Sequence, residues 1–446
     1  MTDDLRQMTI GAFVYPTGYH VGAWRHPDVP ADAGVNFSFY AEVAQLAERG
    51  KFDFIFLPDS SALRGADLAA LSRTALRYVS QFEPLTLLGA LAVVTDRVGL
   101  TATVSSSYFE PFHAARMLAS LDHLSGGRVG WNLVTSQNPE EAYNFGLDAQ
   151  PEHGARYRRA HEFADVVKGL WDCWQDDAFV YDKAGGRFFR PEAMQPLHHR
   201  GEHFAVRGPL NIPRSPQGHP VTLQAGSSEV GRELAARTGE VIFTAQDTMA
   251  GAQEFYKDVR SRMAAHGRGH DEIRIVPGVF PYVGHTRQEA QDKFDELQEL
   301  IDPVVGLGQL QSELGHVDLS GYDMNGPLPP LAESNTGKGR QRLIVEMAER
   351  EGLTIRQLYQ HIAGSRGHWQ VIGSVTDVAD ELQQWFESEA TDGCMVMAPA
   401  LPLHLRDFVE LVVPELQRRG LFRTDYETTT LRGHLGLARP AGTRES

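Results

Sequence analysis

The residues best suited to hold a phosphate lie in the sequence QAGSSEVGREL, Gln224 to Leu234. A strand is expected to end before Gly226, which lets the backbone approach a ligand, and Ser227 and Ser228 stand at the start of a helix. Free backbone amides, two hydroxyls and the positive end of the helix dipole all suit an anion. The same residues could equally form an ordinary serine cap with Glu229 in the first turn. From the residues alone, both interpretations stay open.

Two polar residues occupy predicted strands at places where a side chain can meet a ligand. Asp59 closes the apolar run KFDFIFLPD, and Asn132 lies in GRVGWNLV, where bulky residues alternate with a glycine and an amide. In a closed parallel barrel the bulky side would face the outer helices. Asn132 would then point inward near the carboxyl end of its strand, where such folds keep their chemistry. The alternatives are that Asp59 caps the next segment and that Asn132 is a hydrogen-bonded core residue.

An imidazole and an indole lie in the loop after the first predicted strand, in the sequence YHVGAWRHP. His20 has the pKa range for proton transfer near neutral pH, and Trp24 could line a substrate pocket beside it. A histidine in a loop can also simply be solvated. Further along, the sequence EHGARYRRAHEF places His153 and Tyr157 four residues apart on a predicted helix. These two could instead be ordinary surface and packing side chains.

Stretches with the pattern of buried strands alternate with helical patterns along the chain, and most of the strands end in small or acidic residues. Such alternation predicts parallel strands joined by right-handed crossovers. The predicted strands are Thr9–Val14, Lys51–Asp59, Val98–Val104, Arg128–Val134, Val221–Ala225, Glu240–Thr244, Ile273–Val283 and Cys394–Ala398. Eight strands with their helices predict a (β/α)8 TIM barrel, with residues 1–446 as a single domain. A doubly wound open sheet would need the strands split between two domains, and no linker is visible.

Two long stretches interrupt this alternation, at about residues 176–219 and 302–373. Glycine, proline and basic residues dominate the first stretch. Loops of this length in a compact domain are usually functional or disordered. We expect both stretches to be insertions at the carboxyl-terminal face of the barrel and to act as lids.

The composition excludes several classes of partner. The chain has 446 residues with 42 basic and 58 acidic side chains, a net charge of −16, which argues against nucleic acid or an anionic membrane as the main partner. Cys173 and Cys394 lie in apolar contexts and indicate reduced core residues of a cytoplasmic protein. The start, MTDDLRQMTI, lacks the features of a signal peptide, and no apolar run is long enough to span a membrane. The 18 histidines form no HExxH motif, so no metal site is expected.

The sequence around Asn132 resembles that of a known family. GRVGWNLVTS, followed by NFG, resembles the flavin-dependent monooxygenases of the nitrilotriacetate and dibenzothiophene-sulfone type, a branch of the bacterial luciferase-like superfamily. The segments GEHFAVRGPLNIPRSPQGHP, QAGSSEVGRELAARTGEVIFTAQ and VVPELQRRGLFRTDYE extend the resemblance over nearly the whole chain. They are most similar to the nitrilotriacetate and EDTA monooxygenase side of the family. The stretch between Asp59 and Phe82 is shorter than in several relatives.

The resemblance implies a luciferase-like barrel that is the oxygenase component of a two-component system. A separate NAD(P)H:FMN reductase would supply reduced FMN, and the enzyme would use O2 to oxidise and cleave a small organic substrate at a C–N or C–S bond. The resemblance also implies flavin-ring contacts for Asp59 and Thr103. The complete set of expected cofactor-binding residues is Asp59, Thr103, Asn132, His153, Tyr157, Ser227 and Ser228, with His20 as the catalytic candidate and Trp24 in the substrate pocket.

Other functions remain open at this point. An F420-dependent oxidoreductase of the same superfamily would transfer hydride and ignore oxygen. A barrel hydrolase or lyase, with a metal or without a cofactor, would never acquire flavin, and a non-catalytic flavin-binding protein would bind it without turnover. By analogy with barrels that pair through their helices, we expect a homodimer or a homotetramer.

Overall fold

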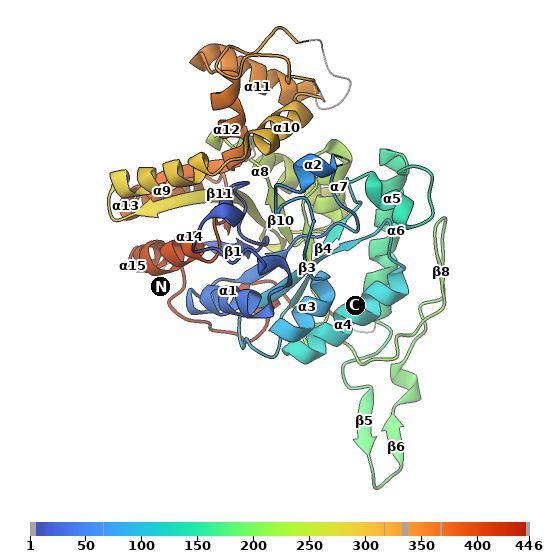
Figure 1. The fold of residues 1–446 in the computed structure, drawn as a ribbon. Helices are drawn as coiled ribbons and strands as arrows, with labels where there is room; N and C mark the ends of the chain where they lie inside the picture. Colours follow the sequence, from blue (N-terminus) through green and yellow to red (C-terminus); the bar gives the residue numbers. More distant parts are fainter. Residues whose placement is uncertain (1–5, 66, 316, 332–337, 366–367, 443–446) are drawn as a thin grey trace.

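Eight parallel strands close into a barrel at the centre of the molecule (Figure 1). The computed structural model describes residues 6–65, 67–315, 317–331, 338–365 and 368–442. The barrel strands are β1 (Thr9–Phe13), β2 (Phe54–Leu57), β3 (Gly99–Ser105), β4 (Val129–Val134), β9 (Val221–Gln224), β10 (Val241–Thr244), β11 (Arg274–Gly284) and β13 (Gly393–Val396). β1 pairs with β13, with Thr9 beside Gly393, so the first and last strands close the ring. The predicted (β/α)8 barrel is confirmed.

Helices surround the barrel because the strands present bulky apolar side chains outward. On β4, Val129, Trp131 and Leu133 are fully buried, and the Trp131 ring lies 6.0 Å from the rings of Phe163 and Trp171 on the facing helix. The helices between barrel strands are α1 (Phe37–Arg49), α2 (Leu68–Leu71), α3 (Pro84–Leu91), α4 (Pro111–Ser125), α5 (Glu140–Asn144), α6 (His153–Trp171), α7 (Glu229–Thr238), α8 (Met249–Met263), α9 (Arg287–Glu299) and α13 (Val375–Glu387).

The last outer helix is continuous but irregular. It runs through α14 (Leu403–Asp407), a π-helical turn (Phe408–Val412) and α15 (Val413–Arg418). Pro414 has no N–H to donate and its ring crowds the preceding turn of an α-helix. The wider π turn, which ends two residues before Pro414, is the local adjustment that lets the helix continue past this residue.

The first insertion is not a lid. It joins the end of α6 to the start of β9, and a segment that leads into a parallel strand starts from the amino-terminal face of the barrel. Its strands form two small hairpins, β5 (Phe179–Asp182) with β6 (Arg187–Phe189) and β7 (His199–Arg200) with β8 (Ala205–Val206). Figure 1 shows β5 and β6 extending from the end of the molecule opposite α10, α11 and α12. The expectation that residues 176–219 lie on the carboxyl-terminal face and cover the barrel mouth is therefore wrong.

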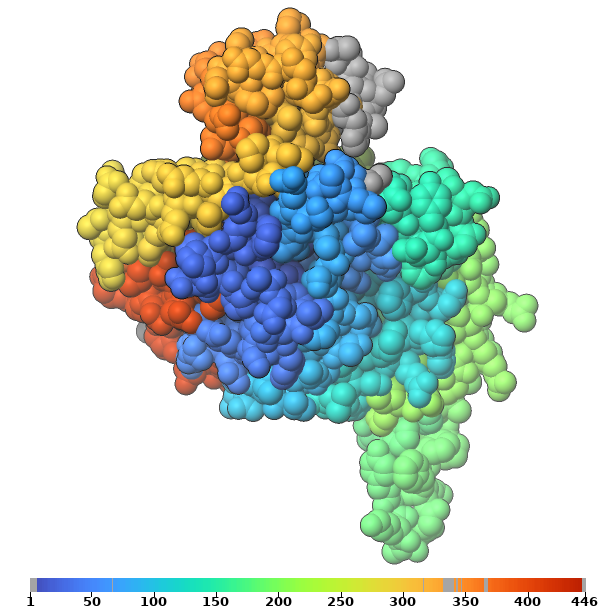
Figure 2. All heavy atoms as spheres, viewed as in Figure 1, coloured from blue at the N-terminus to red at the C-terminus, as the bar shows by residue number. Residues whose placement is uncertain are grey.

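The second insertion lies at the other end and has more regular structure than its sequence predicts. It contains α10 (Pro303–Glu313), α11 (Lys338–Glu351), α12 (Ile355–Ser365) and β12 (Trp369–Ser374). β12 pairs in parallel with the later half of β11, from Val279 to Gly284, and so adds a ninth strand to the sheet. Figure 2 shows the two insertions as separate projections from the body of the molecule. Residues 332–337 lie outside the described ranges.

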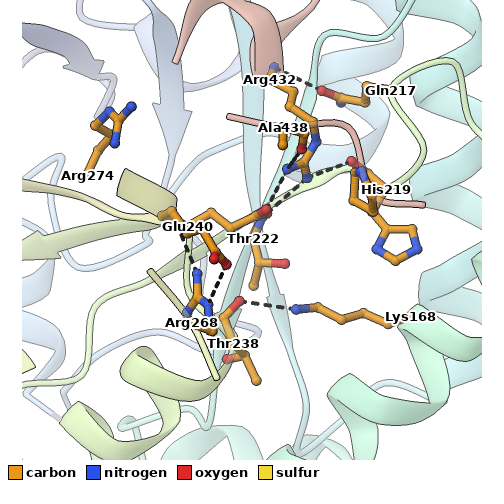
Figure 3. A network of polar contacts seen from close by, with 12 residues as sticks. Lys168, Gln217, His219, Thr222, Thr238, Glu240, Arg268, Arg274, Arg432 and Ala438 are labelled. Carbon is orange, nitrogen blue, oxygen red and sulfur yellow. Dashed lines mark hydrogen bonds and ion pairs between the residues drawn. The ribbon is translucent and has the colours of Figure 1, made fainter. Parts of the chain in front are cut away.

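The C-terminal segment fastens the base of the barrel through buried ionic contacts (Figure 3). Arg432, in the short helix α16 (Leu431–His434), donates to both carboxylate oxygens of Glu240 at 2.6 and 3.1 Å. The same guanidinium donates to the carbonyl oxygens of His219 and Ala438, each at 3.1 Å. The backbone N–H of Arg432 donates to Gln217 Oε1 at 3.1 Å. One arginine thus joins the C-terminal segment to the end of the first insertion and to the start of β10.

Candidate active site

A cavity of about 250 Å³ opens at the carboxyl ends of the barrel strands. Four of the residues predicted from the sequence line it: Asp59, Thr103, Asn132 and Tyr157. They come from the ends of β2, β3 and β4 and from the second turn of α6, so segments far apart in the sequence meet here because parallel strands end at one face. This is the face at which enzymes with this barrel carry their active sites.

The floor of the cavity is polar and keeps one acceptor free. Asn132 is 3% exposed, and its side-chain amide donates to Thr103 Oγ1 at 2.9 Å. Within the described part of the chain, Asn132 Oδ1 is buried and accepts no hydrogen bond. Leaving a buried acceptor unpaired costs free energy, so this oxygen is suited to receive an N–H or O–H from a bound molecule. The inward orientation expected for Asn132 agrees with its place in the cavity lining.

One wall is aromatic. Phe13, Phe56 and Phe243 line the cavity, and their ring centroids are 5.0 to 6.1 Å apart in tilted arrangements. All three extend from the ends of barrel strands, β1, β2 and β10. An apolar wall facing a polar floor favours a flat aromatic ligand that has hydrogen-bonding groups on its edge.

Asp59 carries the strongest electrostatic perturbation in the cavity. Burial raises the pKa of this carboxyl to about 6, and the nearby carboxylate of Glu83 adds to the shift, while the Gln81 side chain opposes it by donating to Asp59 Oδ1 at 3.0 Å. A carboxyl with such a pKa can exchange a proton near neutral pH. Asp59 is therefore both a polar contact for a ligand and a group that can hold a proton.

Replacing Asp59 with asparagine is expected to stabilise the ligand-free protein above pH 6. Because the folded-state pKa of about 6 exceeds the ordinary 3.8, the folded state holds the proton more tightly. The stability that this tighter proton binding contributes is complete below about pH 3.8 and is lost as the pH rises through 6. At pH 8 the ionised Asp59 side chain therefore destabilises the folded state. We expect Asp59→Asn to gain about 3 kcal/mol in urea unfolding at pH 8 and less than about 1 kcal/mol at pH 4. The control Asp148→Asn, at an exposed carboxylate, should show no such difference; equal gains for Asp59→Asn at both pH values would contradict the shift.

The turn after β9 forms a tight cradle. A Cβ on Gly226 would lie 2.9 Å from Cα of Gly231 and 3.2 Å from the Tyr157 hydroxyl oxygen, and one on Gly231 would lie 3.0 Å from that oxygen. The turn can approach the first turn of α7 this closely because both positions are glycine. Gly226 lines the cavity, and Tyr157 is 8% exposed between the cavity and the turn.

The serines and the histidine predicted for the phosphate lie next to this cradle, outside the cavity lining. Ser228 caps α7 and accepts a hydrogen bond from the N–H of Gly231 at 3.2 Å, while Ser227 and Ser228 are both exposed. His153 is exposed at the start of α6, and its ring centroid lies 4.9 Å from that of Tyr157. The structure therefore brings His153, Tyr157 and the amino end of α7 to one side of the cavity mouth.

His20 and Trp24 are not part of this cavity. His20 is 1% exposed, its Nδ1 accepts from the N–H of Gly22 at 3.1 Å, and burial lowers its pKa to about 3. A histidine with that pKa is neutral near pH 7. Trp24 lines a separate cavity of about 200 Å³ together with Thr17 and Ser72. The loop after β1 thus folds these two side chains away from the site at which the sequence places them.

Three of the further lining residues show why the sequence reasoning missed part of the site. Gln224 ends β9, donates to the carbonyl oxygen of Leu133 at 2.7 Å, and accepts from the N–H of Gly226 at 3.2 Å. Asp59 is identified because it lies at the end of a predicted strand, and the same criterion identifies Gln224. Arg64 and Tyr78 come from the loop after β2, where the sequence gives no such signal.

The described residues lack two kinds of feature. They contain no group of three histidine, cysteine, aspartate or glutamate side chains placed to hold a metal ion. Among them there is also no helix both long and apolar enough to cross a bilayer.

Comparisons with known proteins agree on one family. The profile of the family described as "Luciferase-like monooxygenase" matches residues 13–392. The chain is 52% identical over 442 residues to N-acetyl-S-(2-succino)cysteine monooxygenase of Bacillus subtilis (strain 168), covering 99% of both chains. It is 49% identical to nitrilotriacetate monooxygenase component A of Aminobacter aminovorans, covering 98% of this chain and 97% of that one. A solved structure of riboflavin lyase (RcaE) with modified FMN and riboflavin has a TM-score of 0.85 and 31% identity, covering 97% of each chain.

Proposed function

Since the chain belongs to the luciferase-like monooxygenase family, it is an enzyme of that family, and we propose that it is the oxygenase component of a two-component system that uses reduced FMN and O2. A single observation carries the cofactor assignment. One cavity at the carboxyl-terminal face joins an aromatic wall, a polar floor with a free acceptor and a glycine cradle at a helix start. These match the ring, the ring edge and the phosphate end of a flavin mononucleotide.

The residues present fit this cofactor. Asn132 Oδ1 would accept from an N–H on the ring edge, the three phenylalanines would pack against the ring, and Asp59 and Thr103 would contact its polar side. We place the phosphate at the amino end of α7, with Ser227, Ser228, His153 and Tyr157 around it. The flavin supplies the activation of O2 when it is bound.

The protein's own contribution is to bind, orient and exclude water. The rings of Phe13, Phe56 and Phe243 keep one side of the cavity apolar, which limits the access of water to a reactive cofactor. The Asp59 carboxyl, with its pKa raised to about 6, can hold a proton or release it close to the reacting molecules. His20 has no part in this proposal because it lies outside the cavity.

We propose that the substrate is a small organic molecule oxidised and cleaved at a C–S or C–N bond. The names of the two relatives support this, since one acts on N-acetyl-S-(2-succino)cysteine and the other on nitrilotriacetate. The words "component A" support a separate NAD(P)H:FMN reductase as partner.

We also propose a homodimer or homotetramer. The support is exposed aromatic surface on the projecting hairpin, where Tyr181 is 55% and Phe188 63% exposed. The buried, free Cys173 and Cys394 fit a cytoplasmic location.

Anaerobic titration with reduced FMN followed by a pulse of O2 tests the proposed function. We expect saturable binding of reduced FMN, and reoxidation with a time course different from that of free reduced FMN, because the aromatic wall limits solvent access. Addition of N-acetyl-S-(2-succino)cysteine or nitrilotriacetate should then give an oxidised product. The measurements are flavin absorbance, oxygen consumption and mass analysis of the product.

Two outcomes would overturn the proposal. Absence of binding, with reoxidation identical to that of free flavin, would point to a hydrolase or lyase without flavin. Binding and reduction of F420 without oxygen consumption would point to hydride transfer. Heat-treated protein serves as the control for adventitious flavin chemistry.

A further inference from the structure

A second and larger cavity adjoins the candidate active site. Its volume is about 380 Å³, and Arg64 lines both cavities. One wall is the loop that carries α2, and the other is α10 from the second insertion. Figure 1 shows α10 directly beside α2, at the end of the barrel where the strands finish. Arg64 thus stands at the boundary between the two cavities.

The second cavity has cationic and amide groups facing each other. Arg64 and Arg77 come from the loop wall, and Gln309 and Gln311 come from α10. Within the part of the chain that the structure describes, the guanidinium of Arg64 has no hydrogen-bonding partner. A guanidinium presents its N–H groups in a planar fork that matches a carboxylate. The protein carries a net charge of −16, so a cationic wall beside the active site is a local departure from the charge of the whole molecule.

Two carboxylates also line the second cavity, but both are already paired. Asp67 caps α2 and accepts from the N–H groups of Ala69 and Ala70 at 2.9 and 3.3 Å. Asp318 accepts from the N–H of Ser320 at 2.9 Å and from the Gln311 side chain at 3.2 Å. These contacts spread the two negative charges over amide donors. With both carboxylates engaged, the guanidinium of Arg64 is the cavity's charged donor without a partner among the described residues.

The backbone of the loop wall is held in an unusual conformation. Arg77 and Tyr78 are consecutive non-glycine residues with φ of 69° and 61°, in the left-handed region that such residues rarely adopt. The N–H of Arg64 donates to the carbonyl oxygen of Arg77 at 3.0 Å, which ties the two arginines together. As a result Tyr78 lines the first cavity while Arg77 lines the second. Strain of this kind tends to persist where side-chain placement serves function.

We propose that the second cavity is the substrate's carboxylate-binding subsite, formed by Arg64 and Arg77, and that the substrates are therefore small organic acids with two or more carboxylates. The proposal rests on the proposed function, because it places the scissile bond in the flavin cavity. One carboxylate binds the arginines in the second cavity, and the rest of the molecule reaches past Tyr78 into the first. Neutral sulfides, amines and sulfones lack the group that this subsite recognises.

Calorimetric titration with tricarballylate, an unreactive tricarboxylate, tests the subsite. We expect the wild-type protein to bind tricarballylate and to bind its neutral trimethyl ester at least 10-fold more weakly. Arg64→Gln and Arg77→Asn should each weaken tricarballylate binding about 10-fold, since each removes a charge-assisted contact. Asparagine suits position 77 because it tolerates the left-handed conformation. Arg187→Gln is the control: Arg187 is exposed on the projecting hairpin and lines neither cavity, so its loss should leave binding unchanged.

The same samples are titrated anaerobically with reduced FMN, which separates the two proposals. Wild-type protein that binds reduced FMN but binds acid and ester equally, or variants that bind tricarballylate as tightly as wild type, would overturn the subsite alone. Wild-type protein that binds tricarballylate through the two arginines but never binds reduced FMN would overturn the proposed function and leave the subsite standing.

Discussion

Replacing Ser228 with aspartate is expected to weaken the binding of reduced FMN by about 100-fold. Ser228 caps α7 beside the glycine cradle, and aspartate caps a helix as well as serine does, so the fold should not change. The new charge would lie a few ångströms from the proposed phosphate position. A like charge at ~5 Å costs about 3 kcal/mol at the effective dielectric constant of a protein surface, which corresponds to a factor of about 100 in affinity.

Asparagine at position 228 is the matched control, because it keeps the cap and the shape but adds no charge. We expect Ser228→Asn to bind reduced FMN within about 5-fold of wild type, since its cap is equivalent. Reduced riboflavin, which lacks the phosphate, should bind equally to both variants. Equal FMN affinities for the aspartate and asparagine variants would place the phosphate elsewhere.

Replacing Arg432 with methionine is expected to lower the free energy of unfolding by about 3–5 kcal/mol. The Arg432 and Glu240 side chains are 4% and 16% exposed, and the guanidinium holds both oxygens of the carboxylate. Burial alone would raise the pKa of Glu240, but the contact with Arg432 helps to keep this pKa below its ordinary value. Methionine fills a similar volume but leaves that negative charge with one fewer partner. Urea unfolding at pH 7 is the measurement.

A double variant separates the loss of the pair from the loss of packing. Arg432→Met combined with Glu240→Leu should be more stable than Arg432→Met alone, because no uncompensated charge is left buried. Arg418→Met is the control, since Arg418 is 70% exposed beside Glu415 and surface pairs contribute about 0–1 kcal/mol. An unfolding free energy within 1 kcal/mol of wild type for Arg432→Met would contradict the role given to this pair.

The barrel itself could be predicted from the sequence because its strands are buried on both faces. Such strands need continuous apolar runs. The eight predicted runs, of which the first begins at Thr9 and the last at Cys394, overlap the eight barrel strands. β12 is different. It adds to the later half of β11 and follows the long second insertion, so the sequence does not separate it from that insertion. The hairpin strands of the first insertion are two to four residues long, too short for a periodic pattern. The assignment of residues 1–446 to one domain stays a prediction.

The candidate site could be predicted where strand geometry alone fixes a side chain. Asp59, Thr103 and Asn132 line the cavity because they lie near the carboxyl ends of barrel strands. Arg64 and Tyr78 depend instead on the path of a loop with left-handed residues, which no periodicity reveals. His20 shows the opposite error, because the loop after β1 turns it into the core. The roles of His153, Ser227 and Ser228 stay predictions that the aspartate variant tests in part.

The pairing of β1 with β13 also governs how the chain can be made in the cell. Thr9 on β1 pairs with Gly393 on β13, which is synthesised much later. A chain still emerging from the ribosome therefore leaves one edge of β1 unpaired until most of the protein has been made. An apolar strand with a free edge can pair with another chain, which makes the unfinished barrel prone to aggregation. The Arg432 clamp is translated later still. Slow translation near the C-terminus, or a stop codon a few residues before Arg432, would therefore expose the molecule at its most vulnerable stage.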